Sequence, residues 1–125
     1  EEELAGYRAA LEWTFTRNRA TPVTPALLRR LHTLAQRGAG DAGQWKSRDN
    51  EIIEFTPSGQ RRVRFGPVPA RQTPAAMDRL CRRYFEALED GRVPPLLVTA
   101  TFVLDFLCIH PFRDGNGRVS RLAAT

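Results

Sequence analysis

Residues 96–121 have the sequence LLVTATFVLDFLCIHPFRDGNGRVSR, which joins a long apolar run to a dense group of polar functional residues. Directly after the run lie a histidine, an aspartate, a glycine-rich turn and two arginines, namely His110, Asp114, Gly115-Asn116-Gly117, Arg118 and Arg121. Each residue alone has an ordinary structural explanation, as a cap, a turn former or a solvated side chain. Their coincidence within one loop predicts a phosphate-binding site instead.

Each part of this stretch suits a phosphate ligand. Glycines at 115 and 117 let the backbone adopt a positive φ and approach a ligand closely, while amides at the start of the next helix point at a bound anion. Arg118 and Arg121 are three residues apart, so they share a helix face and reach the same polyphosphate. Asp114 is a candidate Mg²⁺ ligand, because this hard cation enters with one or two carboxylates together with the nucleotide.

Helical patterns surround the motif. Residues 96–109 are apolar nearly all round, so we expect a central helix that is buried on every side. A further helix is expected from about Asn116 to the end of the chain. Earlier signals predict three more helices: residues 2–18, a second opened by Thr24-Pro25 and ended by Gly38, and a third opened by Thr73-Pro74 and ended by Gly91.

Between residues 51 and 65 the apolar period changes to two. Ile53 and Phe55 share one face, Val63 and Phe65 share another, and Pro57-Ser58-Gly59 lies between the two runs. This pattern predicts one β-hairpin.

The composition is that of one globular domain. The chain has 125 residues, of which 42% are hydrophobic and 26% charged, and a net charge of +5. No apolar run approaches the roughly 18 residues of a membrane span, and the acidic start is unlike a signal peptide. Cys81 and Cys108 fall in apolar helical patterns, which indicates reduced core thiols and a cytoplasmic protein. We expect residues 1–125 to be a single domain, and a fragment truncated after the motif.

The string from His110 to Arg121 resembles the Fic motif, His-x-Phe-x-(Asp/Glu)-Gly-Asn-Gly-Arg-x-x-Arg, and matches every fixed position. The helix from Thr24 to Ala35, the Gly43-Gln44-Trp45-Lys46 segment, the hairpin and the apolar helix also follow the order of that family. Lys46 departs from the arginine more often seen there, which concerns a secondary contact. The resemblance implies a mainly α fold, a Fic-type helical bundle with one β-hairpin flap.

The resemblance implies a protein adenylyltransferase (AMPylator), which transfers AMP from ATP to a Ser, Thr or Tyr hydroxyl of a target protein and releases pyrophosphate. Carried over by position, His110 would be the general base and Phe112 would anchor the loop. Asp114 would bind Mg²⁺. The phosphates would be held by Gly115, Asn116, Gly117, Arg118 and Arg121.

The resemblance also implies partners. The hairpin, with Ile52, Ile53 and Glu54, would be a flap on which a segment of the target lies; an ordinary hairpin that covers the core is the alternative. No inhibitory (Ser/Thr)-x-x-x-Glu-(Gly/Asn) string occurs in the chain, so we expect an inhibitory helix, if there is one, upstream or on another chain. A homo-oligomer stays open.

Other functions compete with this hypothesis. A different Fic-type transfer, of phosphate or another nucleoside monophosphate, is one; Doc-like phosphate-transferring toxins carry lysine where Gly117 stands. An Arg-rich nucleic-acid-binding module is another, because eighteen arginines accompany Lys46, the single lysine. The G-x-G-x-x-G string at residues 38–43 follows a helix rather than a strand, which favours a loop. We interpret His32 as structural and Trp45 as a core or flap contact.

Overall fold

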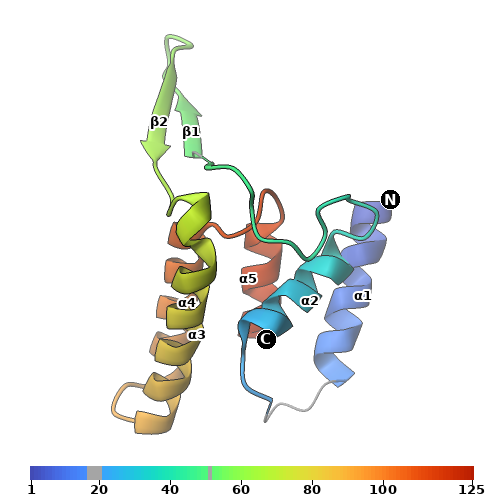
Figure 1. Ribbon diagram of the computed structural model, residues 1–125, viewed down its shortest axis with the longest axis vertical. Helices are drawn as coiled ribbons and strands as arrows, with labels where there is room; N and C mark the ends of the chain where they lie inside the picture. Colours follow the sequence, from blue (N-terminus) through green and yellow to red (C-terminus); the bar gives the residue numbers. More distant parts are fainter. Residues whose placement is uncertain (17–20, 51) are drawn as a thin grey trace.

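A computed structural model describes residues 1–16, 21–50 and 52–125, with side chains excepted at 52–54 and 63–65. Its elements are α1 (Glu2–Thr16), α2 (Pro25–Ala35), β1 (Ile52–Phe55), β2 (Arg61–Phe65), the 3₁₀ turn η1 (Ala70–Gln72), α3 (Thr73–Asp90), α4 (Pro95–Ile109) and α5 (Asn116–Ala124). The described chain is thus mainly α with one hairpin, as predicted (Figure 1). None of these helices is long and apolar enough to cross a membrane.

The helix ends follow local signals with two exceptions. Thr24 caps α2, where its side chain accepts a hydrogen bond from the Leu27 amide at 3.1 Å, and Gly91 ends α3 in the left-handed conformation. Thr73 was expected to cap α3 but is its buried first residue, and its hydroxyl donates to the Pro69 carbonyl. The second helix ends at Ala35, before Gly38. Of the first predicted helix, residues 17 and 18 lie outside the described residues.

Helix α5 is the centre of the bundle. It contacts α1, α2 and α4, while α4 in turn packs against α3. Its inward face carries Val119, Leu122 and Ala123, all of them buried. Since the motif loop leads directly into α5, the loop lies at the N-terminus of the central helix.

The expectation that residues 96–109 form a central helix buried on every side is wrong. Val98, Phe102, Phe106 and Ile109 face the core, but Leu96 is 80% exposed and Leu104 is 61% exposed. Among the helices and strands of the described chain, α4 contacts α3 and α5 alone, so its far side has no covering element. An apolar composition favours burial of a helix, but the number of elements that pack around the helix depends on the topology of the fold.

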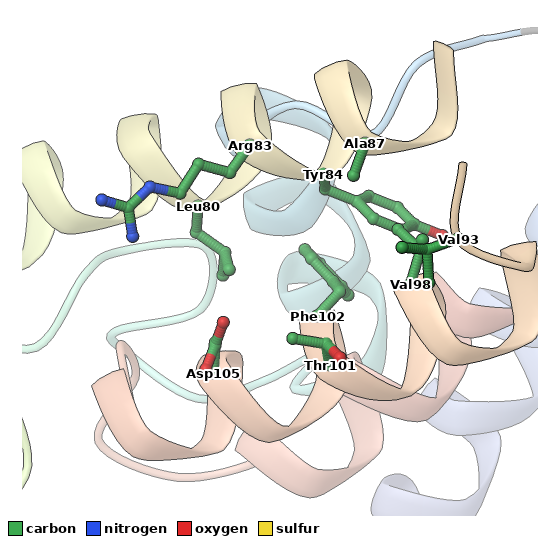
Figure 2. Close-up of a pocket in the computed structure, with 9 residues that line it drawn as sticks. All are labelled: Leu80, Arg83, Tyr84, Ala87, Val93, Val98, Thr101, Phe102 and Asp105. Atoms are coloured by element: carbon green, nitrogen blue, oxygen red, sulfur yellow. The ribbon is translucent and has the colours of Figure 1, made fainter. Parts of the chain in front are cut away.

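A largely apolar pocket of about 270 Å³ lies along the seam between α3 and α4 (Figure 2). Tyr84 stacks on Phe102 with ring centroids 4.4 Å apart, and its hydroxyl bonds to that of Thr99 at 3.0 Å. Phe85 and Leu88 of α3 are exposed, although the helical pattern assigned them to the apolar face. This seam is distinct from the cleft that the motif forms.

The hairpin stands apart from the helices. Strands β1 and β2 pair antiparallel, with Ile53 opposite Val63, and Gly59 has a φ of +84° in the turn. Within the described chain, neither strand contacts another helix or strand, and Figure 1 shows the pair projecting beyond the end of α3. Phe55 is 73% exposed. The alternative in which the hairpin covers the core is therefore wrong.

Candidate active site

The motif loop connects the C-terminus of α4 to the N-terminus of α5. Helix α4 ends at Ile109, and His110 follows as its C-cap in the left-handed conformation, with a φ of +53° and an amide that donates to the Phe106 carbonyl at 2.8 Å. Pro111 cannot donate a further helical hydrogen bond. The chain then reverses, and Gly115, with a φ of +81°, opens α5. Two left-handed residues thus bound a short loop that places His110 beside the start of α5.

Phe112 anchors this loop in the core. Its side chain is fully buried and stacks on the His32 ring, with centroids 3.8 Å apart and ring planes within 3°. The Trp45 ring lies against it at 5.1 Å, which agrees with the core contact expected of that residue. A stacked, buried aromatic pair holds the loop more firmly than a turn sequence alone could.

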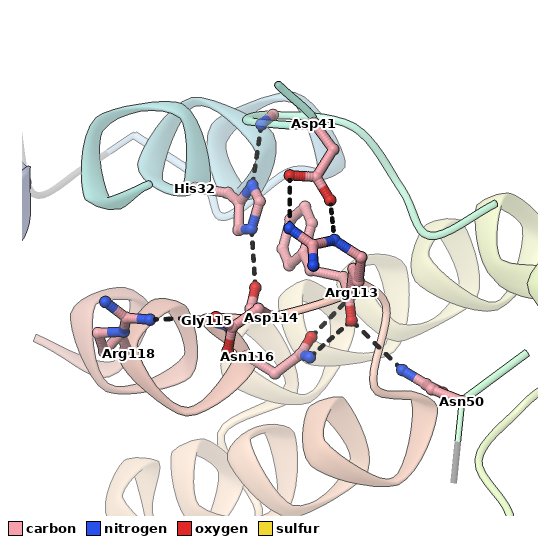
Figure 3. A network of polar contacts seen from close by, with 10 residues as sticks. His32, Asp41, Asn50, Arg113, Asp114, Gly115, Asn116 and Arg118 are labelled. Carbon is pink, nitrogen blue, oxygen red and sulfur yellow. Dashed lines mark hydrogen bonds and ion pairs between the residues drawn. The ribbon is translucent and has the colours of Figure 1, made fainter. Parts of the chain in front are cut away.

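His32 connects the loop at Gly43 to the motif loop (Figure 3). Its Nδ1 accepts from the Gly43 amide at 2.8 Å, so the proton resides on Nε2, which donates to the Asp114 carbonyl at 2.9 Å. Burial lowers the pKa of His32 and keeps the ring neutral. His32 is therefore structural, as predicted, but it fastens distant segments rather than its own helix.

Asn116 also supports the loop. Its side-chain oxygen accepts from the Phe112 amide at 2.9 Å, and its Nδ2 donates to the Phe112 carbonyl at 2.8 Å. The side chain is buried, so it points away from any ligand. The amide of Asn116, like those of Gly117 and Arg118, belongs to the first turn of α5, where backbone donors have no partner within the helix.

The predicted site residues meet in one cleft of about 250 Å³. Its lining consists of His110, Arg113, Asp114, Gly115, Asn116, Gly117, Arg118 and Arg121. The structure thus brings the predicted base, metal ligand and phosphate-binding residues together at the N-terminus of the central helix. The three flap residues lie in β1, and their side chains are outside what the structure describes.

The imidazole of His110 is held in one tautomer. Its Nδ1 lies 3.3 Å from the Leu107 carbonyl, so Nδ1 carries the proton and Nε2 keeps a lone pair. Burial lowers the pKa of His110, and the positive charge of Lys46 lowers it further. At neutral pH the ring is accordingly neutral and able to accept a proton.

The two arginines differ in their surroundings. Arg118 is largely buried and pairs with Glu3 of α1 at 2.5 Å, while its other terminal nitrogen lies 3.9 Å from Asp114. The Gln36 side-chain oxygen, turned toward this group, accepts from Arg118 at 2.9 Å. Arg121, one helical turn further on, is exposed. One guanidinium is therefore prepositioned and the other is free to close on a ligand.

The two glycines have different roles. Gly115 has the positive φ that was expected, and a Cβ there would lie 2.4 Å from the Gln36 side chain. Gly117 does not: it is a helical residue of α5, so the expectation of a positive φ at this position is wrong. A Cβ at Gly117 would instead lie 3.2 Å from the Arg121 guanidinium. A side chain at Gly117 would therefore crowd that guanidinium.

Asp114 fits a Mg²⁺ ion that phosphate oxygens of a ligand also coordinate. Its Oδ1 accepts from the Gly115 amide at 2.8 Å, and its side chain is 71% exposed toward the cleft. Within the described part of the chain, no three acidic, histidine or cysteine groups gather as a metal site. One carboxylate supports Mg²⁺ when phosphate oxygens complete the coordination, but not a cage made by the protein alone.

Sequence patterns missed several supports of the loop. Arg113, at a variable position of the motif, donates to Asp41 at 2.6 Å, and this pair lowers the pKa of the Asp41 carboxyl. Gln36 and Asn50 carry no helical or strand pattern that marks them. Lys46 was expected to make a secondary contact only, but it is buried beside the loop. Pairing across such distances in the chain leaves no local signal.

Comparison with known proteins agrees with this geometry. A solved Fic domain containing signaling protein from Bacteroides thetaiotaomicron matches 98% of this chain and 46% of its own, with a TM-score of 0.85 and 28% identity. A Fic family protein from Desulfovibrio desulfuricans matches 98% of this chain and 34% of its own, with a TM-score of 0.73 and 27% identity. The chain thus spans less than half of either solved chain.

Two further findings concern sequence. A stretch of 44 residues is 50% identical to the ribonucleoside-diphosphate reductase small chain of Ostreid herpesvirus 1, but it covers 32% of this chain and 8% of that protein, too little to indicate a shared function. A sequence model of the Fic/DOC family matches residues 22–125, from just before α2 through the motif to the end of α5. Because that match takes in most of the chain and its whole cleft, the chain belongs to the Fic/DOC family.

Proposed function

We propose that this domain is a protein adenylyltransferase that transfers AMP from ATP to a hydroxyl side chain of a target protein. One observation carries the proposal: a neutral imidazole with a free Nε2 shares a cleft with two arginines and the N-terminus of a buried helix. Family membership supports a transfer of this general type, while the choice of AMP and of a Ser, Thr or Tyr target extends it.

The cleft suits the phosphates of ATP. Amides of the first turn of α5 donate to phosphate oxygens, and the helix dipole favours negative charge at that place. Arg118 and Arg121 hold the β- and γ-phosphates, which leave together as pyrophosphate. Asp114 would hold Mg²⁺, which when bound neutralises phosphate charge. Phosphoryl-group transfer needs mainly such positioning and charge stabilisation.

His110 acts at the attacking oxygen. The target hydroxyl forms a new bond from oxygen to the α-phosphorus, while the bond from that phosphorus to the oxygen bridging to the β-phosphate breaks. The hydroxyl proton passes to Nε2 of His110, and pyrophosphate leaves with the bridging oxygen. Because burial lowers the pKa of His110, the imidazole is unprotonated at neutral pH when the reaction begins, which is the state required.

The hairpin would receive the target. A strand edge pairs through backbone groups with an extended segment and accepts many sequences. The substitution Ile53→Pro disrupts the β1–β2 pairing, since proline cannot donate within a ladder. We expect the KM for the target to rise while ATP affinity stays unchanged, and Ile53→Val to behave as wild type. Unchanged target kinetics in Ile53→Pro would remove the hairpin from the proposal.

Isotope labelling tests the reaction type. A chain that includes residues 1–125 is incubated with Mg²⁺, cell lysate and ATP labelled at either the α- or the γ-phosphate. Protein label from the α position supports nucleotidyl transfer, and label from the γ position shows phosphate transfer instead. Label from neither, together with salt-sensitive binding to nucleic acid that ATP does not affect, favours the nucleic-acid-binding module. An inactive His110→Ala protein is the control for label from other enzymes.

A further inference from the structure

Two residues outside the motif bind its backbone. Lys46 is only 6% exposed, and its Nζ donates to the Ile109 carbonyl at 3.0 Å and to the Asn50 side-chain oxygen at 2.9 Å. The Lys46 amide donates to the Pro111 carbonyl at 2.8 Å. Both residues lie on the segment between α2 and β1, more than fifty positions before the motif.

Asn50 completes the set (Figure 3). Its Nδ2 donates to the carbonyls of His110 and Phe112, each at 3.3 Å. Four consecutive carbonyls, at residues 109, 110, 111 and 112, therefore accept hydrogen bonds from Lys46 and Asn50. Carbonyls at the end of a helix have no intrahelical donor, so they take partners of this kind or water.

The segment so bound includes a strained residue. His110 is the single non-glycine residue with a positive φ in the part of the chain that the structure describes, at +53°. A side chain other than glycine stays in this region only when its surroundings hold it there. The bonds to the carbonyls immediately before and after His110 fix the peptide planes on both of its sides.

These hydrogen bonds alone do not explain why a charged residue occupies position 46. Both side-chain bonds of its ammonium group go to neutral oxygens, and burial lowers the pKa of Lys46, while the charge of Asp49 opposes that shift. A buried charge is costly when a neutral donor could hold the same carbonyl. Its electrostatic effect falls on His110: burial and the charge of Lys46 lower the pKa of this imidazole, while the hydrogen bond to the Leu107 carbonyl and the charge of Asp114 raise it. Arg113, Arg118 and Arg121 line the same cleft.

We propose that Lys46 and Asn50 form a clamp on the backbone around His110 that sets the position and the electrostatic surroundings of its imidazole for the reaction. Both are positioning residues, which act through His110 and touch no reacting atom. The clamp deepens the proposed function and rests on it. A purely structural staple would stabilise the domain but would leave the chemistry of His110 unchanged.

The test compares four variants of the full chain: Lys46→Met, Lys46→Arg, Asn50→Ala and, as a control for lost positive charge on the same segment, Arg48→Met. Three quantities are measured for each: kcat and the KM for ATP, the His110 imidazole pKa by NMR, and the melting temperature. The ATP phosphates are held by α5 and not by the clamp, so the clamp should affect kcat and not the KM for ATP.

For Lys46→Met we expect kcat to fall by roughly 10- to 100-fold, since small misplacements of a catalytic group have effects of that size, with the KM for ATP unchanged. The His110 pKa should rise because a nearby positive charge is lost. Lys46→Arg should restore the pKa and most of kcat, and Arg48→Met should match wild type. Asn50→Ala should lower kcat without raising the His110 pKa. If Lys46→Met fails to fold, the kcat of Asn50→Ala tests the clamp instead.

The proposal is overturned if Lys46→Met folds with wild-type kcat and an unchanged His110 pKa. It is also overturned if Lys46→Arg loses as much as Lys46→Met in both quantities. If the wild-type chain transfers no label, the proposed function fails, but the His110 pKa in Lys46→Met against wild type still decides whether the clamp acts on the imidazole. The two failures are therefore distinguishable.

Discussion

The motif loop, residues 110–115, and the hairpin formed by β1 and β2 are held in opposite ways. The loop is bonded by segments from across the chain, through His32, Lys46 and Asn50, and its Phe112 is fully buried. The hairpin contacts no other helix or strand of the described chain and exposes Phe55. A reacting group must be placed within a fraction of an ångström, whereas an arm that pairs with varied targets gains from having few fixed contacts.

The largest effect is expected in the loop. We expect His110→Ala to lower the transfer rate by about 10²- to 10⁴-fold, because the target hydroxyl loses its base. ATP affinity should stay nearly unchanged, since α5 provides the phosphate contacts. Initial rates with labelled ATP and isothermal titration with ATP measure the two effects. Lost ATP binding with unchanged transfer would contradict the assigned role.

Aromatic truncation should separate the two regions by stability. Phe112→Ala removes a fully buried ring that stacks on His32, and we expect the free energy of unfolding to fall by about 3–5 kcal/mol. Phe55→Ala removes an exposed ring of the hairpin and should change it by no more than about 0.5 kcal/mol. Urea denaturation measures both. Similar values for the two variants would mean that the hairpin is coupled to the core.

Glycine substitutions compare the backbone of the motif loop with that of the hairpin. Gly115→Ala places a side chain at a φ of +81° and displaces Gln36, so we expect a loss of at least about 1–2 kcal/mol. Gly91→Ala, at a φ of +72° with open space around it, measures the conformational cost alone. Gly59→Ala has a similar φ but lies in the hairpin turn, so local amide exchange should change there while global unfolding does not. A global loss in Gly59→Ala equal to that in Gly91→Ala would refute the independence of the hairpin.

The pH dependence of stability should also arise at the motif loop, because His110 belongs to it and His32 contacts it. Burial lowers the pKa of His32 and of His110 below the ordinary value of 6.5. Below pH 6.5 the unfolded chain binds more protons than the folded one, so the free energy of unfolding falls as the pH drops from there, and it is retained above. Denaturation at several pH values tests this. His110→Ala should show a shallower decline, and an identical one would exclude a contribution from His110.

The smallest effect concerns Glu3, a contact of the loop region that competes with the proposed ligand. Its carboxylate pairs with Arg118, the guanidinium that we assign to a phosphate. We expect Glu3→Gln to raise ATP affinity by no more than about fivefold, because an exposed carboxylate contributes up to about 1 kcal/mol to such a pair. Titration calorimetry with ATP measures the change. Weaker ATP binding in the variant would indicate that Glu3 positions Arg118 rather than competes for it.

Local sequence patterns were sufficient to predict the features that depend on neighbours along the chain. The Thr24 cap, the glycine stop at Gly91 and the alternating hairpin are local choices of backbone conformation. The string from His110 to Arg121 likewise places base, carboxylate and arginines by spacing alone, because one loop and one helical turn bring them to the same cleft. These predictions needed no knowledge of how the helices pack.

The surroundings of that cleft depend instead on how the helices pack together. It made α5 central and left Leu96 and Leu104 of α4 exposed, since the number of neighbours of a helix depends on topology and not on its own composition. It also brought Lys46 to the Ile109 carbonyl and Glu3 to Arg118. Contacts between residues far apart in the chain form when the helices assemble, so periodicity and spacing carry no record of them.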